Sequence, residues 1–137
     1  MTEYIQFFMA HSLLFIALLV VLVLLIANEV HAQWSAASRC SSQKLVQMMN
    51  HDQASVIDIR EKTDYRAGKI IGSKNIPSTD LLKKINELDK SKTVVLVCGN
   101  GQQSQKQAQA LKKQGLNVYY LGGGITAWRN DNMPLDK

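Results

Sequence analysis

Apolar residues form one long run near the start of the chain and only short groups after it. Fifteen consecutive apolar residues occupy 13–27, and four more lie just upstream, separated from the run by His11 and Ser12. The whole segment 7–27 has 21 residues, which as an α-helix span about 31 Å at about 1.5 Å per residue. Because the hydrocarbon core of a bilayer is about 30 Å thick, the pattern predicts one transmembrane helix within an N-terminal anchor, residues 1–34.

Beyond the anchor, strand-like and helix-like patterns alternate along the chain. Apolar and β-branched groups predict strands at 54–59, 93–97 and 118–121, with a brief extended piece within 70–77. The helices expected around these strands are, in chain order, one capped by Ser41 or Ser42, a turn at 64–68, one from Ser78 through Leu88, one over 104–114, and a short one through Ala127 and Trp128.

This alternation predicts an α/β domain with a parallel sheet, right-handed crossovers and helices on both faces. The run at 93–97 is uninterrupted and β-branched, which is typical of a central strand buried on both faces. We assign residues 42–137 to this domain and residues 35–41 to a polar juxtamembrane linker. The residues expected in its core include Val56, Ile57, Leu81, Ile85, Val95, Leu96, Leu111 and Val118.

The distribution of charge indicates how the anchor is oriented. All 16 Lys and Arg lie at Arg39 or later, so that no basic residue precedes the apolar run. Under the positive-inside rule, the N-terminus lies outside and the domain lies in the cytoplasm. The alternative is a cleaved signal peptide, because Val30-His31-Ala32 resembles a cleavage site. Cleavage would place the domain in the periplasm and make a Cys40–Cys98 disulfide plausible, but a secretory signal has a basic residue before its apolar run and this chain has none.

Composition excludes several classes of protein. The chain has no internal repeat, only two Cys, and ten Gly and Pro together, so collagen-like, repeat and disulfide-framework classes are excluded. Residues 35–137 carry 16 basic and 9 acidic residues, a net charge of +7. These charges are scattered, and no aromatic residues alternate with them, so no nucleic acid is expected as a partner. A weak attraction to anionic lipid is expected instead. The three His show no metal-ligand spacing, and neither a metal nor a cofactor is expected.

The strongest chemical signal is Cys98, which directly follows the central strand and precedes a Gly-rich loop and a helix. Ligand sites of open α/β sheets lie at the carboxyl ends of the strands. Loop N–H groups and the amino end of the next helix favour an anion at this point, so they favour a nucleophilic thiolate. A buried structural cysteine is the alternative interpretation.

Three ordered motifs resemble the rhodanese family, across roughly residues 42–135. They are Asp58-Ile59-Arg60 with Tyr65 to Ser73 and Asn75-Ile76-Pro77; Cys98-Gly99-Asn100-Gly101-Gln102-Gln103-Ser104; and Leu121-Gly122-Gly123-Gly124-Ile125-Thr126-Ala127-Trp128. An N-terminal span before one such domain is similar to membrane-anchored rhodanese-like proteins of the bacterial inner membrane. The related phosphatases fit less well, because they have His before the cysteine and Arg six residues after it, where Val97 and Ser104 stand.

The resemblance implies a sulfurtransferase in which Cys98 accepts sulfane sulfur as a persulfide and passes it to a thiol or cyanide. The implied donor is a small sulfur compound or a persulfide protein, and the anchor is compatible with a membrane-protein partner. Asp58 and Arg60 are implied to support the sheet edge beside the site. The residues implied to form the anion-binding loop are Gly99, Asn100, Gly101, Gln102, Gln103 and Ser104.

Two departures from the family bear on the substrate. Many members carry a basic residue in the loop, whereas this loop has none, and the nearest basic residue in sequence is Lys106. The usual His before the Ile-x-Gly motif is replaced by Lys69. A loop without a cation predicts weak turnover of thiosulfate, a dianion. It also motivates the alternative function, a membrane-tethered interaction module with a rhodanese fold and little catalysis.

Overall fold

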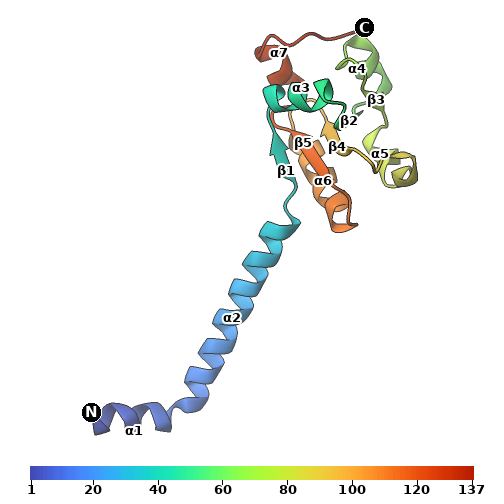
Figure 1. Ribbon diagram of the computed structural model, residues 1–137. Coiled ribbons are helices and arrows are strands. Elements are labelled where there is room, and N and C mark those ends of the chain that lie inside the picture. The colour runs from blue at the N-terminus through green and yellow to red at the C-terminus, as the bar shows by residue number, and fades with distance from the viewer. The chain divides into compact units, whose positions relative to one another are not determined.

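The computed structural model describes residues 1–137, except for the side chains of Trp34 and Ser35, and divides the chain into two compact units. The first unit, Met1–Ser35, consists of α1 (Thr2–Ala10) and α2 (Ser12–Ser35) (Figure 1). Its apolar stretch Ser12–Gln33 has 22 residues and a mean hydropathy of 2.9, long and apolar enough to cross a membrane. The helix breaks at His11, where φ is −114°. The residues before His11 therefore belong to a separate helix, and the apolar helix lies further along the chain than the segment 7–27.

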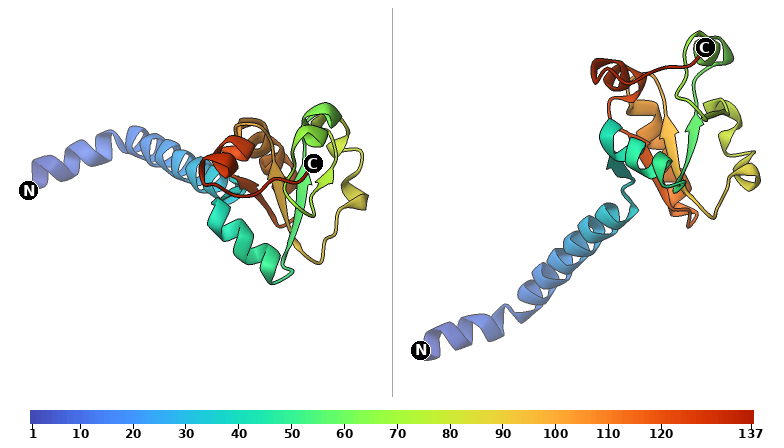
Figure 2. Two further views of the ribbon diagram at one scale, coloured as in Figure 1. Left: turned by 90° about the horizontal axis from the view of Figure 1, so that it is seen from above. Right: turned by 45° about the horizontal axis from the view of Figure 1, so that its top comes forward.

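The second unit, Ala36–Lys137, is built on one parallel sheet with the strand order β1-β5-β4-β2-β3 (Figures 1 and 2). The predicted fold class, a parallel α/β sheet after an N-terminal apolar helix, is confirmed. Each strand pairs with a neighbour of the same direction, and β4 is the central strand. The strands are β1 (Ser38–Cys40), β2 (Ala54–Asp58), β3 (Lys74–Asn75), β4 (Thr93–Val97) and β5 (Val118–Leu121). The helices are α3 (Ser42–Asn50), α4 (Lys62–Ala67), α5 (Ser78–Leu81), the 3₁₀ helix η1 (Ile85–Glu87), α6 (Gln102–Lys113) and α7 (Gly124–Asn130).

Two apolar clusters cover the two faces of the sheet because successive side chains of a strand point to opposite sides. Val94 and Leu96 of β4 pack in a cluster with side chains from α5, η1 and α6. Val95 and Val97 pack in a second cluster with side chains from α3 and α7 on the other face. Of the predicted core residues, only Ile85 is partly exposed, and the other seven are buried.

The assignment of residues 35–41 to a linker is wrong for Ser38–Cys40, which form the edge strand β1. This strand pairs in parallel with β5, with Ser38 opposite Tyr119 and Cys40 opposite Leu121. Three residues with two polar side chains are too short to produce a recognisable strand pattern. Pairing with β5 and burial of the Cys40 side chain stabilise the strand, and both depend on tertiary structure.

Of two predicted helix caps, the structure contains one and lacks the other. Ser41 caps α3, because its Oγ accepts the Lys44 N–H at 3.2 Å. The helix expected from Ser78 through Leu88 is instead divided into α5 and η1, and Pro77 rather than Ser78 precedes its first residue. Leu81 and Leu88 are nevertheless both buried, so that the apolar spacing reports burial here and not a continuous helix.

Candidate active site

Cys98 is the first residue after the central strand β4, at the carboxyl end of the sheet. Only 2% of it is exposed, and its side chain belongs to the same cluster as Val94 and Leu96. The chain then turns sharply, and α6 begins four residues later at Gln102. Because its strand is fixed by neighbours on both sides, the thiol is held on a rigid support.

Two backbone N–H groups point at the sulfur of Cys98. Gly101 N–H lies 3.1 Å from Sγ, and Ser104 N–H, in the first turn of α6, lies 3.4 Å from it. The thiol donates to Ser104 Oγ at 3.3 Å, and that hydroxyl donates to the Gly101 carbonyl at 3.1 Å. Amide dipoles and the amino end of a 12-residue helix both favour negative charge at this point. The arrangement therefore stabilises a thiolate or a persulfide anion.

The turn that aims Gly101 at the sulfur requires glycine. Gly101 has a φ of +89°, in the left-handed region. A Cβ on this residue would also lie 2.8 Å from Gly123 N, closer than real contacts allow. A side chain here would strain the loop and move its N–H away from the sulfur.

The loop is also tied to α7, a connection that sequence reasoning did not identify. Ile125 N–H donates to the Cys98 carbonyl at 2.9 Å, and both N–H and Oγ1 of Thr126 donate to the Gly99 carbonyl, at 3.1 and 3.0 Å. Gly124 has a φ of +59°, and a Cβ on it would overlap the Cys98 carbonyl oxygen. The signal in the sequence was the Gly122-Gly123-Gly124 run, which the resemblance placed in a closing motif without a contact to the loop.

Two other loop side chains make hydrogen bonds to groups other than the sulfur. Asn100 Oδ1 accepts the Gln102 N–H at 3.0 Å, which shapes the turn. Gln103 Nε2 donates to Ser78 Oγ at 2.8 Å and so links the loop to α5. Gly99, like the side chains of Asn100, Gln102 and Gln103, is exposed. The residues around the sulfur thus contribute backbone N–H groups and one hydroxyl.

Asp58 and Arg60 form a buried ion pair at the end of β2. Arg60 Nη2 donates to Asp58 Oδ2 at 2.7 Å and to the Gly68 carbonyl at 2.7 Å, and Arg60 N–H donates to Asp58 Oδ1 at 3.0 Å. Ile57 and Ile59 pack in the cluster that contains Cys98, so the side chain of Asp58 between them points to the opposite face. The pair fixes the chain after β2 and lies away from the sulfur.

The second cysteine lies on the other face of the sheet from Cys98. Cys40 is 1% exposed and packs in the cluster with α3 and α7, and both cysteines are free. The disulfide considered for a periplasmic domain is therefore not formed, because the two thiols face opposite sides of the sheet and β5 lies between their strands, β1 and β4. Burial raises the pKa of the Cys40 thiol, and the nearby Lys44 ammonium offsets this only in part.

These environments predict different reactivity for the two thiols. We expect iodoacetamide at neutral pH to modify Cys98 first, because amide dipoles stabilise its thiolate, whereas Cys40 should react only at higher pH or after unfolding because its pKa is raised. Peptide mass mapping of the folded full-length protein in detergent measures both sites across a pH series. Equal rates at every pH would contradict the anion-stabilising geometry around Cys98.

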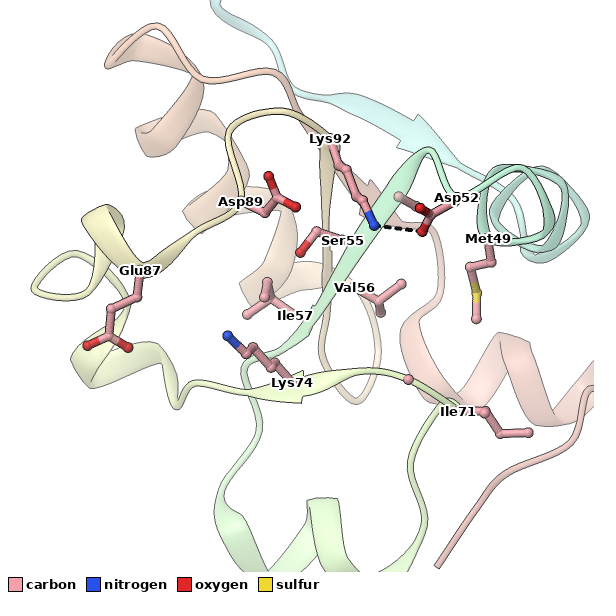
Figure 3. Close-up of a pocket in the computed structure, with 12 residues that line it drawn as sticks. Met49, Asp52, Ser55, Val56, Ile57, Ile71, Lys74, Glu87, Asp89 and Lys92 are labelled. Carbon is pink, nitrogen blue, oxygen red and sulfur yellow. Dashed lines mark hydrogen bonds and ion pairs between the residues drawn. The ribbon is translucent and has the colours of Figure 1, made fainter.

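A separate hollow of about 460 Å³ lies along β2, lined by residues 54–57 and by side chains that include Lys74 and Lys92 (Figure 3). Its wall includes the start of β2 and charged side chains, with Lys92 and Asp52 paired at 2.6 Å. Neither cysteine lines it. Within the described residues, no three His, Cys, Asp or Glu side chains are grouped closely enough to hold a metal ion.

Comparison with known proteins identifies the family to which this chain belongs. Residues 41–131 match the family model described as the rhodanese-like domain. The chain is 34% identical over 139 residues to the uncharacterized protein YibN of Escherichia coli, an alignment that covers 98% of this chain and 97% of YibN. It is 35% identical over 99 residues to thiosulfate sulfurtransferase GlpE of Shewanella oneidensis, covering 72% of this chain and 98% of GlpE.

A solved structure supports the fold. The rhodanese-related protein from Thermoplasma volcanium superposes with a TM-score of 0.68 at 27% identity, covering 72% of this chain and 97% of that one. The alignment with YibN covers almost the whole chain, whereas those with GlpE and the Thermoplasma protein cover about the length of the α/β unit. The α/β unit is thus the part that this chain shares with all three proteins. The alignment with YibN also includes the N-terminal helices.

Proposed function

The chain belongs to the rhodanese-like domain family, and from this premise we propose that it is a membrane-tethered sulfurtransferase that carries sulfane sulfur on Cys98. Family membership and the similarity to GlpE sulfurtransferases support sulfurtransferase-type function for this domain. The observation that carries the assignment to Cys98 is the pair of N–H groups, from Gly101 and Ser104, that converge on its sulfur at the carboxyl end of β4.

The proposed reaction has two displacement steps. The Cys98 thiolate attacks the outer sulfur of the donor, a new S–S bond forms, and the donor's own bond to that sulfur breaks with its electron pair. The result is a persulfide anion on Cys98, which the loop N–H groups from Gly99 to Ser104 would stabilise. An acceptor thiolate or cyanide then attacks the terminal sulfur, takes it, and releases the Cys98 thiolate, so neither an oxidant nor a reductant is consumed.

A mass spectrum of the intact protein after incubation with sulfur donors tests this function. We expect a labile gain of one sulfur atom per chain, lost on treatment with cyanide or a thiol. The alternative, a rhodanese-fold interaction module tethered to the membrane, is motivated by the absence of a cation from the loop itself. The module would show no adduct with thiosulfate, an aryl thiosulfonate or a persulfide protein.

We further propose that α2 spans the bacterial inner membrane once and leaves the α/β domain in the cytoplasm. The length and hydropathy of Ser12–Gln33 support the span, and the absence of Lys and Arg before Arg39 supports the orientation. The lipid bilayer is then one partner of the chain, and the sulfur donor or persulfide protein is another. A domain held at the membrane surface would be positioned to exchange sulfur with a membrane-protein partner.

Membrane insertion is tested by alkaline carbonate extraction of membranes that contain the full-length protein. We expect the protein to stay in the pellet, because a 22-residue apolar helix cannot leave the bilayer without exposing its side chains to water. The double variant Leu19→Arg/Leu22→Arg should move it to the soluble fraction, since each central Arg costs about 2.5–3.5 kcal/mol of insertion free energy. Release of the unaltered protein would contradict the span.

The same membranes test the orientation. Trypsin cleaves after Lys and Arg, and all 16 of these residues lie at Arg39 or later. We expect trypsin added to intact spheroplasts to leave the chain uncut and to digest it only after the membrane is permeabilised. Digestion in intact spheroplasts would place the domain outside and contradict the proposed orientation.

A further inference from the structure

Arg39 lies in the middle of the edge strand β1. It pairs in register with Tyr120 of β5, while the next residue, Cys40, packs on the face that carries α3 and α7. Because neighbouring side chains of a strand point to opposite faces, Arg39 lies on the face that carries Cys98. Tyr120 packs against the cluster on that same face.

From this position the Arg39 side chain extends over Gly122. A Cβ at Gly122 would overlap Arg39 Nε and would lie 2.8 Å from Arg39 Cζ. The pairing of β1 with β5 continues to this point, since Gly122 N–H donates to the Cys40 carbonyl at 2.9 Å. Glycine at 122 therefore provides the space in which the guanidinium group lies.

Both Arg39 and the cysteine loop approach the segment 121–123, Arg39 at Gly122 and Gly101 at Leu121 and Gly123. Leu96 pairs with Tyr120, and Cys98 and Gly122 each lie two residues further along the chain, so both directly follow the carboxyl ends of neighbouring strands. Adjacent strands are about 4.8 Å apart. The loop itself bends toward β5, because a Cβ on Gly101 would lie 3.2 Å from the Leu121 carbonyl oxygen.

The guanidinium group is available to an anion. Arg39 is exposed, and neither of the two salt bridges among the described side chains involves it. Lys106, the basic residue nearest to the loop in sequence, is placed differently. Ser104, Ala108 and Leu111 form the buried side of α6, and Lys106 lies about 200° around the helix from Ser104, so it faces solvent.

We infer that Arg39 is the substrate-binding cation of this site, supplied by β1 in place of a basic residue in the loop. The inference rests on the proposed sulfurtransferase function and names its substrate class: sulfur donors that carry an anionic group beside the sulfane sulfur. With thiosulfate, the Cys98 thiolate takes the outer sulfur and sulfite leaves with the electrons of the broken S–S bond. Arg39 would bind the sulfonate oxygens of the donor and of the departing sulfite.

The direct test compares alkylation of Cys98 by iodoacetate, an anion, with alkylation by iodoacetamide, which is neutral. The ratio of the two rates reports a cation beside the thiolate and does not require turnover. In the full-length protein in detergent, we expect Arg39→Gln to lower this ratio about three- to ten-fold at low salt. The effect should shrink at high ionic strength, since the group is exposed.

Three further variants test whether the effect depends on a positive charge at the position of Arg39. Lys113→Gln removes an exposed cation from the far end of α6 and should leave the ratio unchanged. Arg39→Lys keeps the charge and should retain most of the ratio. Gly122→Ala keeps Arg39 but fills the space over which it lies, and since Gly122 is outside the left-handed region the backbone accepts alanine. This variant should lower the ratio by displacing the guanidinium group.

Steady-state turnover with different donors then tests whether Arg39 binds the substrate. Arg39→Gln should lower kcat/KM for thiosulfate about three- to thirty-fold, the difference between a charge-assisted and a neutral hydrogen bond. The loss should be smaller for benzenethiosulfonate, which carries one negative charge instead of two. An unchanged alkylation ratio, or equal losses for both donors, would overturn the inference. Failure of every donor to transfer sulfur would contradict the sulfurtransferase function instead, while the alkylation ratio would still report the cation.

Discussion

Replacing Cys98 with serine is expected to abolish sulfur transfer while leaving the fold intact. The variant should gain no sulfur atom from any donor, and thiocyanate formation should fall at least about 10³-fold, as expected when a nucleophile is removed from a site that works through covalent catalysis. Serine is close in volume to cysteine, and its hydroxyl can keep the hydrogen bond to Ser104 Oγ that the thiol makes now at 3.3 Å. The thermal midpoint should therefore change little.

Cys40→Ser is the matched control for that variant. Cys40 is as deeply buried as Cys98, but it lies on the other face of the sheet with no converging N–H groups among its recorded contacts. We expect it to keep the sulfur adduct and turnover, with at most a modest loss of stability from a polar group in an apolar cluster. An adduct that persists in Cys98→Ser and disappears in Cys40→Ser would contradict the assignment of the nucleophile.

The sequence predicted the structure best where the local apolar pattern of a segment matches its burial in the folded domain. Val94 to Val97 are buried on both faces, as the uninterrupted apolar run predicts for a central parallel strand. That strand fixes the position of Cys98, because the carboxyl end of a central strand is where such sheets bind their ligands. The α/β fold and the position of the thiol could therefore be predicted without any tertiary contact.

What the sequence did not reveal depends on contacts between distant segments. Ser38–Cys40 become a strand only because β5 pairs with them, and no short-range pattern contains that information. The cation proposed for the site was missed for the same reason. Arg39 lies 59 positions before Cys98 in the numbering. The pairing of β1 with β5 and of β5 with β4 sets it level with Leu96, and from there its side chain extends over Gly122. A search confined to residues near the cysteine would select Lys106, which faces solvent.

The same reasoning applies to the glycines of the closing motif. Gly122 and Gly124 look like flexible spacers in the sequence, but each is required by a neighbour from another segment. Gly124 leaves room for the Cys98 carbonyl, and Gly122 leaves room for the Arg39 side chain. The motif is therefore a surface shaped to hold the cysteine loop on one side and β1 on the other. Their contacts with the cysteine loop and with Arg39 explain why these positions are glycine.

Removing Asp58 is expected to have the largest effect on stability and little direct effect on chemistry. Asp58 is 1% exposed, and its removal leaves the Arg60 guanidinium, only 10% exposed, without its carboxylate. Breaking a buried ion pair in this way costs about 3–5 kcal/mol. For a domain of about 100 residues each kcal/mol lowers Tm by about 4–8 °C, so Asp58→Ala should lower it by about 12 °C or more in a thermal unfolding experiment. Lys92→Ala, which breaks the exposed pair with Asp52, is the control and should change Tm little.

Measuring both Tm and the sulfur adduct distinguishes a structural role of the Asp58–Arg60 pair from a chemical one. Because the Asp58 side chain points to the face opposite Cys98, the Asp58→Ala protein that remains folded at low temperature should still accept a sulfur atom from the donor. Cys98→Ser should show the reverse, a normal Tm without an adduct. An Asp58→Ala protein with a normal Tm and no adduct would place the carboxylate in the chemistry. A low Tm with a normal adduct would establish that Asp58 and Arg60 support the sheet that holds the thiol.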